Sequence, residues 1–344
     1  MAQQPFSRIP KIHDAAELIQ IAYQRSMKVS PPIPLRVSRT IKTKRLAEAR
    51  IRALSDIICS KLISVYKFLP PSNALHPFYK ALLELIVPLS NYDASRRKLR
   101  YSVKIIRRLT RDYIRRIRQA TTPEEVTKLR REAYGRILSV VKRIKRNLNL
   151  LEDVRIKLGK VPSVDPDELV IVVAGYPNVG KSTFVSKVST AKPRIAEYPF
   201  TTTEIVVGHL MLNDKRVQII DTPGLLDRPL SERNRIERMA IAAIQYLADS
   251  IIFMIDPSES SGYTIEEQLS LLKEIKSAFP KIPVLPVLNK VDIASSIQIK
   301  RCESSLKASI PKMIAKDDVG VDDVLAEAVK LALHFRAKKS YAKD

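Results

Sequence analysis

The 344-residue sequence predicts an all-α helical bundle over residues 1–168, followed by an α/β domain over residues 169–344 with a largely parallel sheet and helices on both faces. Three observations predict this division. The length suits two domains of roughly 100–200 residues each. Only two of the eight glycines, Gly135 and Gly159, precede position 169. Apolar residues recur every three or four positions in the first part, whereas the second part has short β-branched runs.

Charged residues, like glycines, are distributed unevenly along the chain. The net charge is +24, and residues 1–168 carry 36 basic and 15 acidic side chains, whereas residues 169–344 carry 24 and 21. Such asymmetry indicates a polyanionic partner for the first domain, most often nucleic acid and less often an anionic membrane surface.

Composition excludes several classes of protein. An apolar fraction of 45% argues against disorder as the dominant state, and Cys59 and Cys302 are too few for a disulfide framework. No run reaches the roughly 18 apolar residues that a membrane span needs, and the first residues lack the apolar region of a secretory signal. We therefore expect a soluble, cytoplasmic protein in a reducing compartment.

Prolines set the expected helix boundaries of the first domain. Pro31, Pro32 and Pro34 separate a helix near 14–29 from a long one near 37–68, and a shorter helix ends by Pro88. The next helix runs over about 92–119. The last opens at Thr122, as an N-cap followed by Pro123 and a reciprocal Glu125, and its apolar stripe comprises Val126, Leu129, Ala133, Ile137, Val141, Ile144, Leu148 and Leu151. An antiparallel bundle buries such stripes.

The second domain alternates strands with helices. Strands are expected over 169–175, 204–212, 215–221, 250–256 and 282–290, and the final helix over about 321–335. An Asn213-Asp214 turn joins the second strand to the third. Continuous apolar strands of this kind indicate a sheet that is covered on both faces.

The first of these strands ends in a phosphate-binding loop, which defines a P-loop domain. Its backbone amides face phosphates, Lys181 reaches the β- and γ-phosphates, and Ser182 binds Mg²⁺. The expected nucleotide contacts in this segment are Gly175, Pro177, Asn178, Val179, Gly180, Lys181, Ser182 and Thr183.

Two further motifs follow on later strands and indicate guanine nucleotides, GTP and GDP. Asp221 begins Asp-Thr-Pro-Gly, where the carboxylate holds a Mg²⁺-bound water and the Gly224 amide senses the γ-phosphate. Asn289-Lys290-Val291-Asp292 supplies a carboxylate that accepts from both N1–H and the 2-amino group of guanine, neither of which adenine offers. Three motifs in order leave little room for chance.

Other candidate residues lie between these motifs. The segment from Lys192 to Thr203 is the expected first switch, where Thr201, Thr202 or Thr203 would complete the Mg²⁺ shell. Ala315 and Lys316 lie where an amide would meet the guanine oxygen, although Ile314 stands where serine is common.

Hydrolysis is expected to be slow, because Leu225 stands where many GTPases position water with glutamine. Asn178 would hold K⁺ near the phosphates or simply stabilise the loop conformation, and the sequence leaves both alternatives open.

The segments GYPNVGKSTFVSKVSTAKPRIAEYPFTTTEIVVGH and DTPGLLDRPLSERN resemble the Obg-related translation GTPases, and within them the nucleolar GTP-binding protein 1 family in its compact archaeal form. The resemblance covers essentially the whole chain. It implies a GTPase that assembles the large ribosomal subunit with its helical domain on ribosomal RNA, together with ribosomal proteins or assembly factors. In the YPFTT motif it adds Phe200 as a nucleotide contact and places the Mg²⁺ ligand at Thr202, so the implied catalytic residues are Lys181, Thr202 and Gly224.

The predicted RNA-binding surface is a basic ridge, whose residues fall within a sector of about 100° on a helical wheel: Arg97, Arg100, Lys104, Arg107, Arg108, Arg111, Arg115 and Arg118. Residues 96–146 hold 19 basic and four acidic residues, too few acids to neutralise the bases. Arginine suits bidentate phosphate contacts. A merely solvated face is the plainer alternative.

Two alternatives to a ribosome-assembly GTPase fit the sequence less well. A signal-recognition-like membrane-targeting GTPase also places a helical bundle before its GTPase domain, but its loop motifs differ and the ridge lacks an apolar insertion face, so no stable membrane association is expected. A binding module with an inactive nucleotide site is disfavoured by Lys181, Ser182 and Asp221. The four histidines are dispersed and indicate no metal site.

Overall fold

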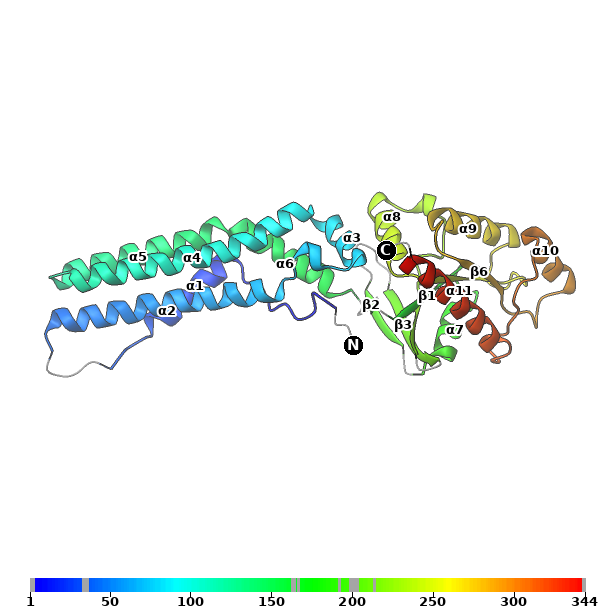
Figure 1. The fold of residues 1–344 in the computed structure, drawn as a ribbon, viewed down its shortest axis with the longest axis horizontal. Coiled ribbons are helices and arrows are strands. Elements are labelled where there is room, and N and C mark those ends of the chain that lie inside the picture. The colour runs from blue at the N-terminus through cyan, green and yellow to red at the C-terminus, as the bar shows by residue number, and fades with distance from the viewer. Residues whose placement is uncertain are drawn as a thin grey trace. The chain divides into compact units, whose positions relative to one another are not determined.

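A computed structural model describes residues 4–32, 37–161, 165, 168–190, 193–197, 204–212 and 215–341. Backbone contacts divide the chain into two compact units: residues 5–75 with 86–159 form the first, and residues 160–344 with 1–4 and 76–85 form the second. Figure 1 shows the first unit as helices and the second as a sheet with helices.

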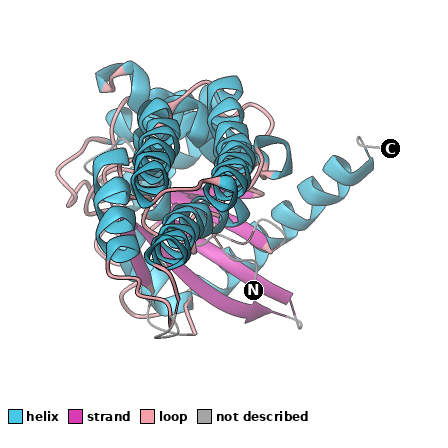
Figure 2. Ribbon diagram, turned by 90° about the vertical axis from the view of Figure 1, so that its left-hand side faces the viewer, coloured by secondary structure: helices cyan, strands magenta, loops and turns pink. Residues whose placement is uncertain are grey.

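Long helices make up the first unit, and the views in Figures 1 and 2 show them running side by side. They are α1 (Ala15–Met27), α2 (Arg39–Phe68), α4 (Leu89–Gln119), α5 (Pro123–Arg143) and α6 (Lys145–Gly159). Helices α2, α4 and α5 pack against one another, and α1 lies against α2 and α5. A short 3-10 turn (Ser72–Ala74) and helix α3 (Pro77–Ile86) connect α2 to α4. The bundle class is confirmed.

The caps explain where these helices begin. The Asp14 carboxylate accepts bonds from the amides of Ala16 and Glu17, and this caps α1. The Thr122 hydroxyl accepts from the Glu125 amide at 3.2 Å, as predicted. The reciprocal bond from Glu125 differs from the prediction. The Glu125 carboxylate accepts from the amide of Thr121 at 2.9 Å, not from the amide of Thr122.

One expectation about the bundle was wrong. The stripe from Val126 to Leu151 is buried throughout, but it does not lie on one helix, since the chain breaks at Ile144 between α5 and α6. There the Ile144 amide bonds to the carbonyls of Val141 and Lys142, a tighter turn than an α-helix makes. The apolar residues keep their spacing of three or four positions across this break, so the sequence pattern does not reveal where one helix ends and the next begins.

The second unit contains, in its described residues, a six-stranded sheet of order β2-β3-β4-β1-β5-β6. The strands are β1 (Leu169–Ala174), β2 (Arg194–Glu197), β3 (Glu204–Leu212), β4 (Lys215–Asp221), β5 (Ser250–Ile255) and β6 (Val284–Leu288). Strands β4, β1, β5 and β6 are parallel, whereas β3 pairs antiparallel with β4 and with the edge strand β2. The largely parallel sheet is confirmed. Strand β2 was not expected, since its four residues fall in the segment interpreted as a switch.

Helices cover both faces of this sheet. They are α7 (Lys181–Val188), α8 (Arg235–Ala243), α9 (Ile265–Ala278), α10 (Ser296–Leu306) and α11 (Val321–Tyr341), with 3-10 turns at Leu230–Glu232 and Ile244–Tyr246. Helix α11 packs against α7, β1 and β5, while α9 packs on β5 from the other side (Figure 1). Strands β1 and β5 are buried along their full length. The carboxyl ends of the parallel strands β1, β4, β5 and β6 therefore meet at one edge, where α/β folds bind ligands.

In the part of the chain that the structure describes, no helix combines the length and apolar character needed to cross a membrane.

Candidate functional site

The phosphate-binding loop connects β1 to α7 and depends on glycine at two positions. Gly175 and Gly180 have φ angles of +133° and +103°. A Cβ atom on Gly180 would lie 2.2 Å from Nδ2 of Asn289, and one on Gly175 would lie 2.5 Å from the Met254 carbonyl oxygen. Asn178 adopts φ +62° with an exposed side chain. Left-handed turns of this kind direct consecutive amides toward an anion.

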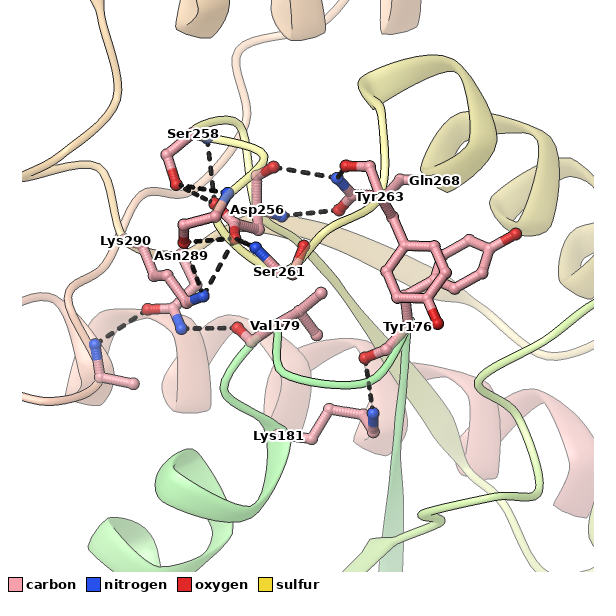
Figure 3. Close-up of polar contacts among 12 residues, drawn as sticks. Tyr176, Val179, Lys181, Asp256, Ser258, Ser261, Tyr263, Gln268, Asn289 and Lys290 are labelled. Carbon is pink, nitrogen blue, oxygen red and sulfur yellow. Dashed lines mark hydrogen bonds and ion pairs between the residues drawn. The ribbon is translucent and has the colours of Figure 1, made fainter.

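Lys181 is the only cation of this loop, and it is buried within it. Its Nζ atom donates to the carbonyl oxygen of Gly175 at 2.8 Å and to that of Tyr176 at 2.7 Å, and Figure 3 shows the second bond. Burial lowers the pKa of Lys181, while the carboxylates of Asp221 and Asp227 oppose that shift. An ammonium bonded to two carbonyl oxygens of the loop is suited to bind the phosphates of a nucleotide.

Asp221 and Ser182 meet at the end of β4. The Ser182 hydroxyl donates to Oδ2 of Asp221 at 2.5 Å, and burial raises the pKa of Asp221 against the opposing effects of this bond and of Lys181. Within the described residues, Oδ1 of Asp221 is buried without a hydrogen-bond partner. A free carboxylate oxygen beside a hydroxyl provides the oxygen ligands that Mg²⁺ prefers, so these two residues fit the ion.

The segment after Asp221 holds an unexpected ion pair. The Gly224 amide, the predicted γ-phosphate sensor, donates to Oδ2 of Asp227 at 2.5 Å. Arg233, 3% exposed, donates through NH2 to the Leu225 carbonyl at 3.0 Å and lies 3.3 Å from Oδ1 of Asp227. Leu225 is fully buried. Its side chain therefore neither reaches nor positions water in this structure.

The base-reading motif is joined to the phosphate loop by Asn289. Its Nδ2 atom donates to the Val179 carbonyl at 2.8 Å, and its Oδ1 atom accepts from the Ala315 amide at 2.9 Å (Figure 3). Asp292 and Lys316 are exposed, on the segments that follow Asn289 and Ala315. The Asn289 side chain thus joins the phosphate loop, the segment that begins at Asn289 and the segment around Ala315 at one edge of the sheet. Its bond to Val179 connects residues that are 110 positions apart.

Some residues of the site were not identified from the sequence. Asp256, Ser260 and Tyr263 lie on the segment after β5 and contact Lys290 or the phosphate loop. Arg233 and Asp227 were likewise missed. Only the position of Asp256 directly after a buried strand hinted at a role. The predicted contacts Phe200, Thr201 and Thr202, with Thr203, lie outside the described residues.

The predicted basic ridge lies on α4, and all eight of its side chains are exposed. Arg118 pairs with Glu48 through two bonds of 3.1 Å, and Arg108 lies 3.9 Å from Asp112. Considering described residues alone, no carboxylate is within ion-pair distance of Arg97, Arg100, Lys104, Arg107, Arg111 or Arg115. The inward residues Leu99, Val103, Ile106, Tyr113 and Ile117 are buried, as expected.

Part of this ridge borders a groove of about 600 Å³ between α2 and α4. Lys104, Arg107, Arg108 and Arg111 line it from α4, and Arg52 lines it from α2. Asp56 is the acidic residue among its lining side chains. The sequence pattern of a single helix could not have revealed the contribution of Arg52.

Two family models match the chain. The one described as NOG1 N-terminal helical domain matches residues 6–165, and the one described as nucleolar GTP-binding protein 1 matches residues 235–292.

Among known proteins, an uncharacterized protein of Methanocaldococcus jannaschii is 39% identical over 297 residues, covering 86% of this chain and 83% of the relative. The nucleolar GTP-binding protein 1 of Caenorhabditis elegans is 35% identical over 288 residues, which cover 84% of this chain and 42% of that protein. The chain spans about half of the length of the eukaryotic relatives, 52% for Drosophila melanogaster. A solved structure described as nucleolar GTP-binding protein 1 from Plasmodium falciparum has 34% identity and a TM-score of 0.47, and the match covers 53% of this chain and 95% of that one.

Proposed function

The chain belongs to the nucleolar GTP-binding protein 1 family, and we propose that it is a Mg²⁺-dependent GTPase that acts as a molecular switch in assembly of the large ribosomal subunit. The observation that carries the nucleotide part is the junction at Asn289, whose side chain bonds to both the phosphate loop and Ala315. A single ligand that carries a base and phosphates would contact all three segments.

Different residues bind the phosphates and the metal ion. Lys181 and the loop amides bind the β- and γ-phosphates, and the Gly224 amide binds the γ-phosphate. Ser182 and Asp221 would hold Mg²⁺, which supplies positive charge against the phosphates. By its position in the YPFTT motif, Thr202 is the family's further Mg²⁺ ligand.

Guanine specificity rests on Asp292. We expect its exposed carboxylate to accept from the two donors on the edge of guanine. The Ala315 amide, which donates to Oδ1 of Asn289 in this structure, is the predicted donor to the guanine oxygen. Adenine would leave that carboxylate without donors, and an unpaired charge is costly. The ligands are therefore GTP and GDP.

The helical unit docks on ribosomal RNA in this proposal. Six ridge cations without a carboxylate partner in the described structure, and the groove that Arg52 shares, form a surface for phosphates. Precursor particles of the large subunit would present that RNA, with ribosomal proteins or assembly factors beside it. We place the protein in the cytoplasm, because the match to the archaeal relative from Methanocaldococcus jannaschii covers 83% of that protein.

Sedimentation tests the choice of partner. Wild-type protein is incubated with large-subunit particles or with anionic liposomes and centrifuged, in parallel with a variant in which Arg107, Arg111 and Arg115 are replaced by Glu. We expect the wild type to pellet with particles, the variant to pellet less, and neither to pellet with liposomes. Pelleting with liposomes alone would favour a membrane-targeting function.

A further inference from the structure

The segment from Asp256 to Tyr263 follows β5 and belongs to none of the nucleotide motifs. Asp256 has 0% exposure, yet its carboxylate is surrounded by donors. It accepts from the Ser261 amide at 2.8 Å, the Ser260 hydroxyl at 3.0 Å, the Lys290 ammonium at 3.0 Å and both the amide and hydroxyl of Ser258 (Figure 3). A buried carboxylate needs such partners, because taking a charge out of water without compensating hydrogen bonds strongly destabilises the fold.

The charge of Asp256 is retained in this setting. Burial by itself would raise the pKa of the Asp256 carboxyl, but hydrogen bonds from Ser258, Lys290 and Ser260 outweigh it and lower the pKa. Its ion-pair partner in the described structure is Lys290, the second residue of the base-reading motif. The Asp256 carboxylate is therefore a buried negative charge that lies against the ammonium of Lys290.

Lys290 is held at both ends. Its backbone, at φ +60°, follows Asn289, and its Nζ atom bonds to Asp256 at 3.0 Å and to the Ser260 hydroxyl at 2.9 Å. The side chain is nevertheless 26% exposed. Because the ammonium is bound to Asp256 and Ser260, the four-carbon stem between it and the backbone is fixed, and its apolar surface suits the face of a planar base.

We propose that Asp256 and Ser260 are positioning residues of the guanine site, which hold the stem of Lys290 as a fixed wall against the base. The proposal rests on the proposed function as a guanine-nucleotide protein. Asp256 and Ser260 act through Lys290 and do not touch the nucleotide themselves.

The same segment is also tied to the phosphate loop. Tyr263 stacks on Tyr176, with ring centroids 4.1 Å apart and ring planes 25° apart. Buried Gln268 accepts from the Asp256 amide at 2.8 Å and donates to the carbonyls of Asp256 at 2.9 Å and Tyr263 at 3.0 Å (Figure 3). These contacts hold the segment in one conformation, so the position of Lys290 is fixed before a nucleotide binds.

A double-mutant cycle tests the proposal. Affinities for GDP and for inorganic tripolyphosphate are measured for the wild type, Asp256→Asn, Lys290→Met and the double variant, with melting temperatures recorded for each. Ser260→Ala serves as a milder variant that removes one of the two Lys290 contacts. Glu259→Gln is the matched control, because Glu259 lies on the same segment but accepts from the Ile265 amide and does not contact Lys290.

Asp256→Asn should weaken GDP binding by about tenfold, the order that a hydrogen bond to a charged group contributes. Tripolyphosphate affinity should stay within about twofold, since the phosphate contacts are unchanged. In the Lys290→Met background Asp256→Asn should have no further effect, because the ammonium that it positions is gone. Ser260→Ala should show a smaller loss than Asp256→Asn, and Glu259→Gln none.

Three results would overturn the proposal: unchanged GDP affinity in Asp256→Asn, an equal loss for tripolyphosphate, or the same loss again in the Lys290→Met background. The last two would show that Asp256 only stabilises the loop. If Asp256→Asn does not fold, Ser260→Ala decides by the same three criteria. A wild-type chain that binds tripolyphosphate but discriminates against no base would contradict the proposed function itself, and this inference with it.

Discussion

At the scale of single residues, the nucleotide site is a set of charges held out of water. Lys181, Asp221 and Asp256 are all buried, and each is bonded to a neighbour in the site. Asp292 differs, because it is exposed and open to a ligand. Changes at buried charges should therefore alter affinity and stability together, whereas a change at Asp292 should alter base selection alone.

Replacing Asp292 by Asn should change the preferred base. The substitution turns one acceptor oxygen into an amide donor, which suits xanthine, whose 2-position carries an acceptor oxygen. Competition of xanthosine and guanosine diphosphates for the variant measures this, and xanthosine diphosphate should bind better. A variant that still prefers GDP would mean that another residue reads the base.

Asp227→Asn should raise the affinity for a GTP analogue relative to GDP by about tenfold, the order of one charge-assisted hydrogen bond. The Asp227 carboxylate accepts from the Gly224 amide, so it competes with the γ-phosphate for that donor. The ratio of the two affinities is the measurement, with the exposed Glu232→Gln as control. The idea fails if both variants keep the wild-type ratio.

Hydrolysis should be slow and faster in KCl than in NaCl at equal ionic strength. Leu225 is buried and leaves the attacking water unpositioned, and Asn178 has an exposed side chain that is free to hold a monovalent ion. Turnover of the wild type and of Asn178→Ala would be compared in both salts. Equal rates for the wild type in the two salts would leave Asn178 with a conformational role only.

At the scale of elements, one glycine is required for the conformation of the phosphate loop, whereas another lowers the stability of a helix. Gly180 is required by its φ of +103° and by the approach of Asn289, whereas Gly135 lies exposed on α5 with no atom within 4 Å of an added Cβ. The first position is fixed by tertiary contact. The second is merely a weak point in a helix, since glycine there costs about 0.5–1 kcal/mol relative to alanine.

The paired substitutions Gly180→Ala and Gly135→Ala should therefore have opposite effects. Gly180→Ala should abolish measurable nucleotide binding and lower stability, because Asn289 has to move away from Val179 and Ala315. Gly135→Ala should raise the free energy of unfolding of the helical unit by about 0.5–1 kcal/mol. Chemical denaturation and nucleotide titration of both variants test this, and a neutral Gly180→Ala would contradict the loop geometry.

At the scale of the whole molecule, charge and catalysis are separated between the two compact units. The exposed cations of α4 lie in one unit, and the described residues that we propose to bind nucleotide lie in the other. The affinities for RNA and for nucleotide should therefore respond to different substitutions.

Replacing Arg107, Arg111 and Arg115 by Glu should weaken RNA binding and flatten its salt dependence, because fewer counterions are released per complex. GDP affinity should stay unchanged. Both affinities would be measured on one preparation over a salt series, with Lys142→Glu on α5 as a control cation that lies outside the α2–α4 groove. An unchanged RNA affinity and salt slope in a folded triple variant would show that the ridge is only solvated.

The sequence alone determined the helical and α/β fold classes and most of the helices and strands, and it predicted the residues of the three nucleotide motifs. It could do so because caps, apolar periodicity and the phosphate loop depend on residues that are close in the chain. Thr122 and Lys181 are examples, since each bonds to residues no more than six positions away in the chain. The assignment of Asp292 likewise needs only the chemistry of guanine.

Only the tertiary structure decided which distant residues meet. The contact of Asp256 with Lys290 spans 34 residues, and the groove needs Arg52 from another helix than the ridge. The turn at Ile144 and the pairing of β2 with β3 were also invisible in the pattern. The physical reason is the same in each case: periodicity records which side of an element is buried, whereas contacts between elements depend on packing, which no local pattern encodes.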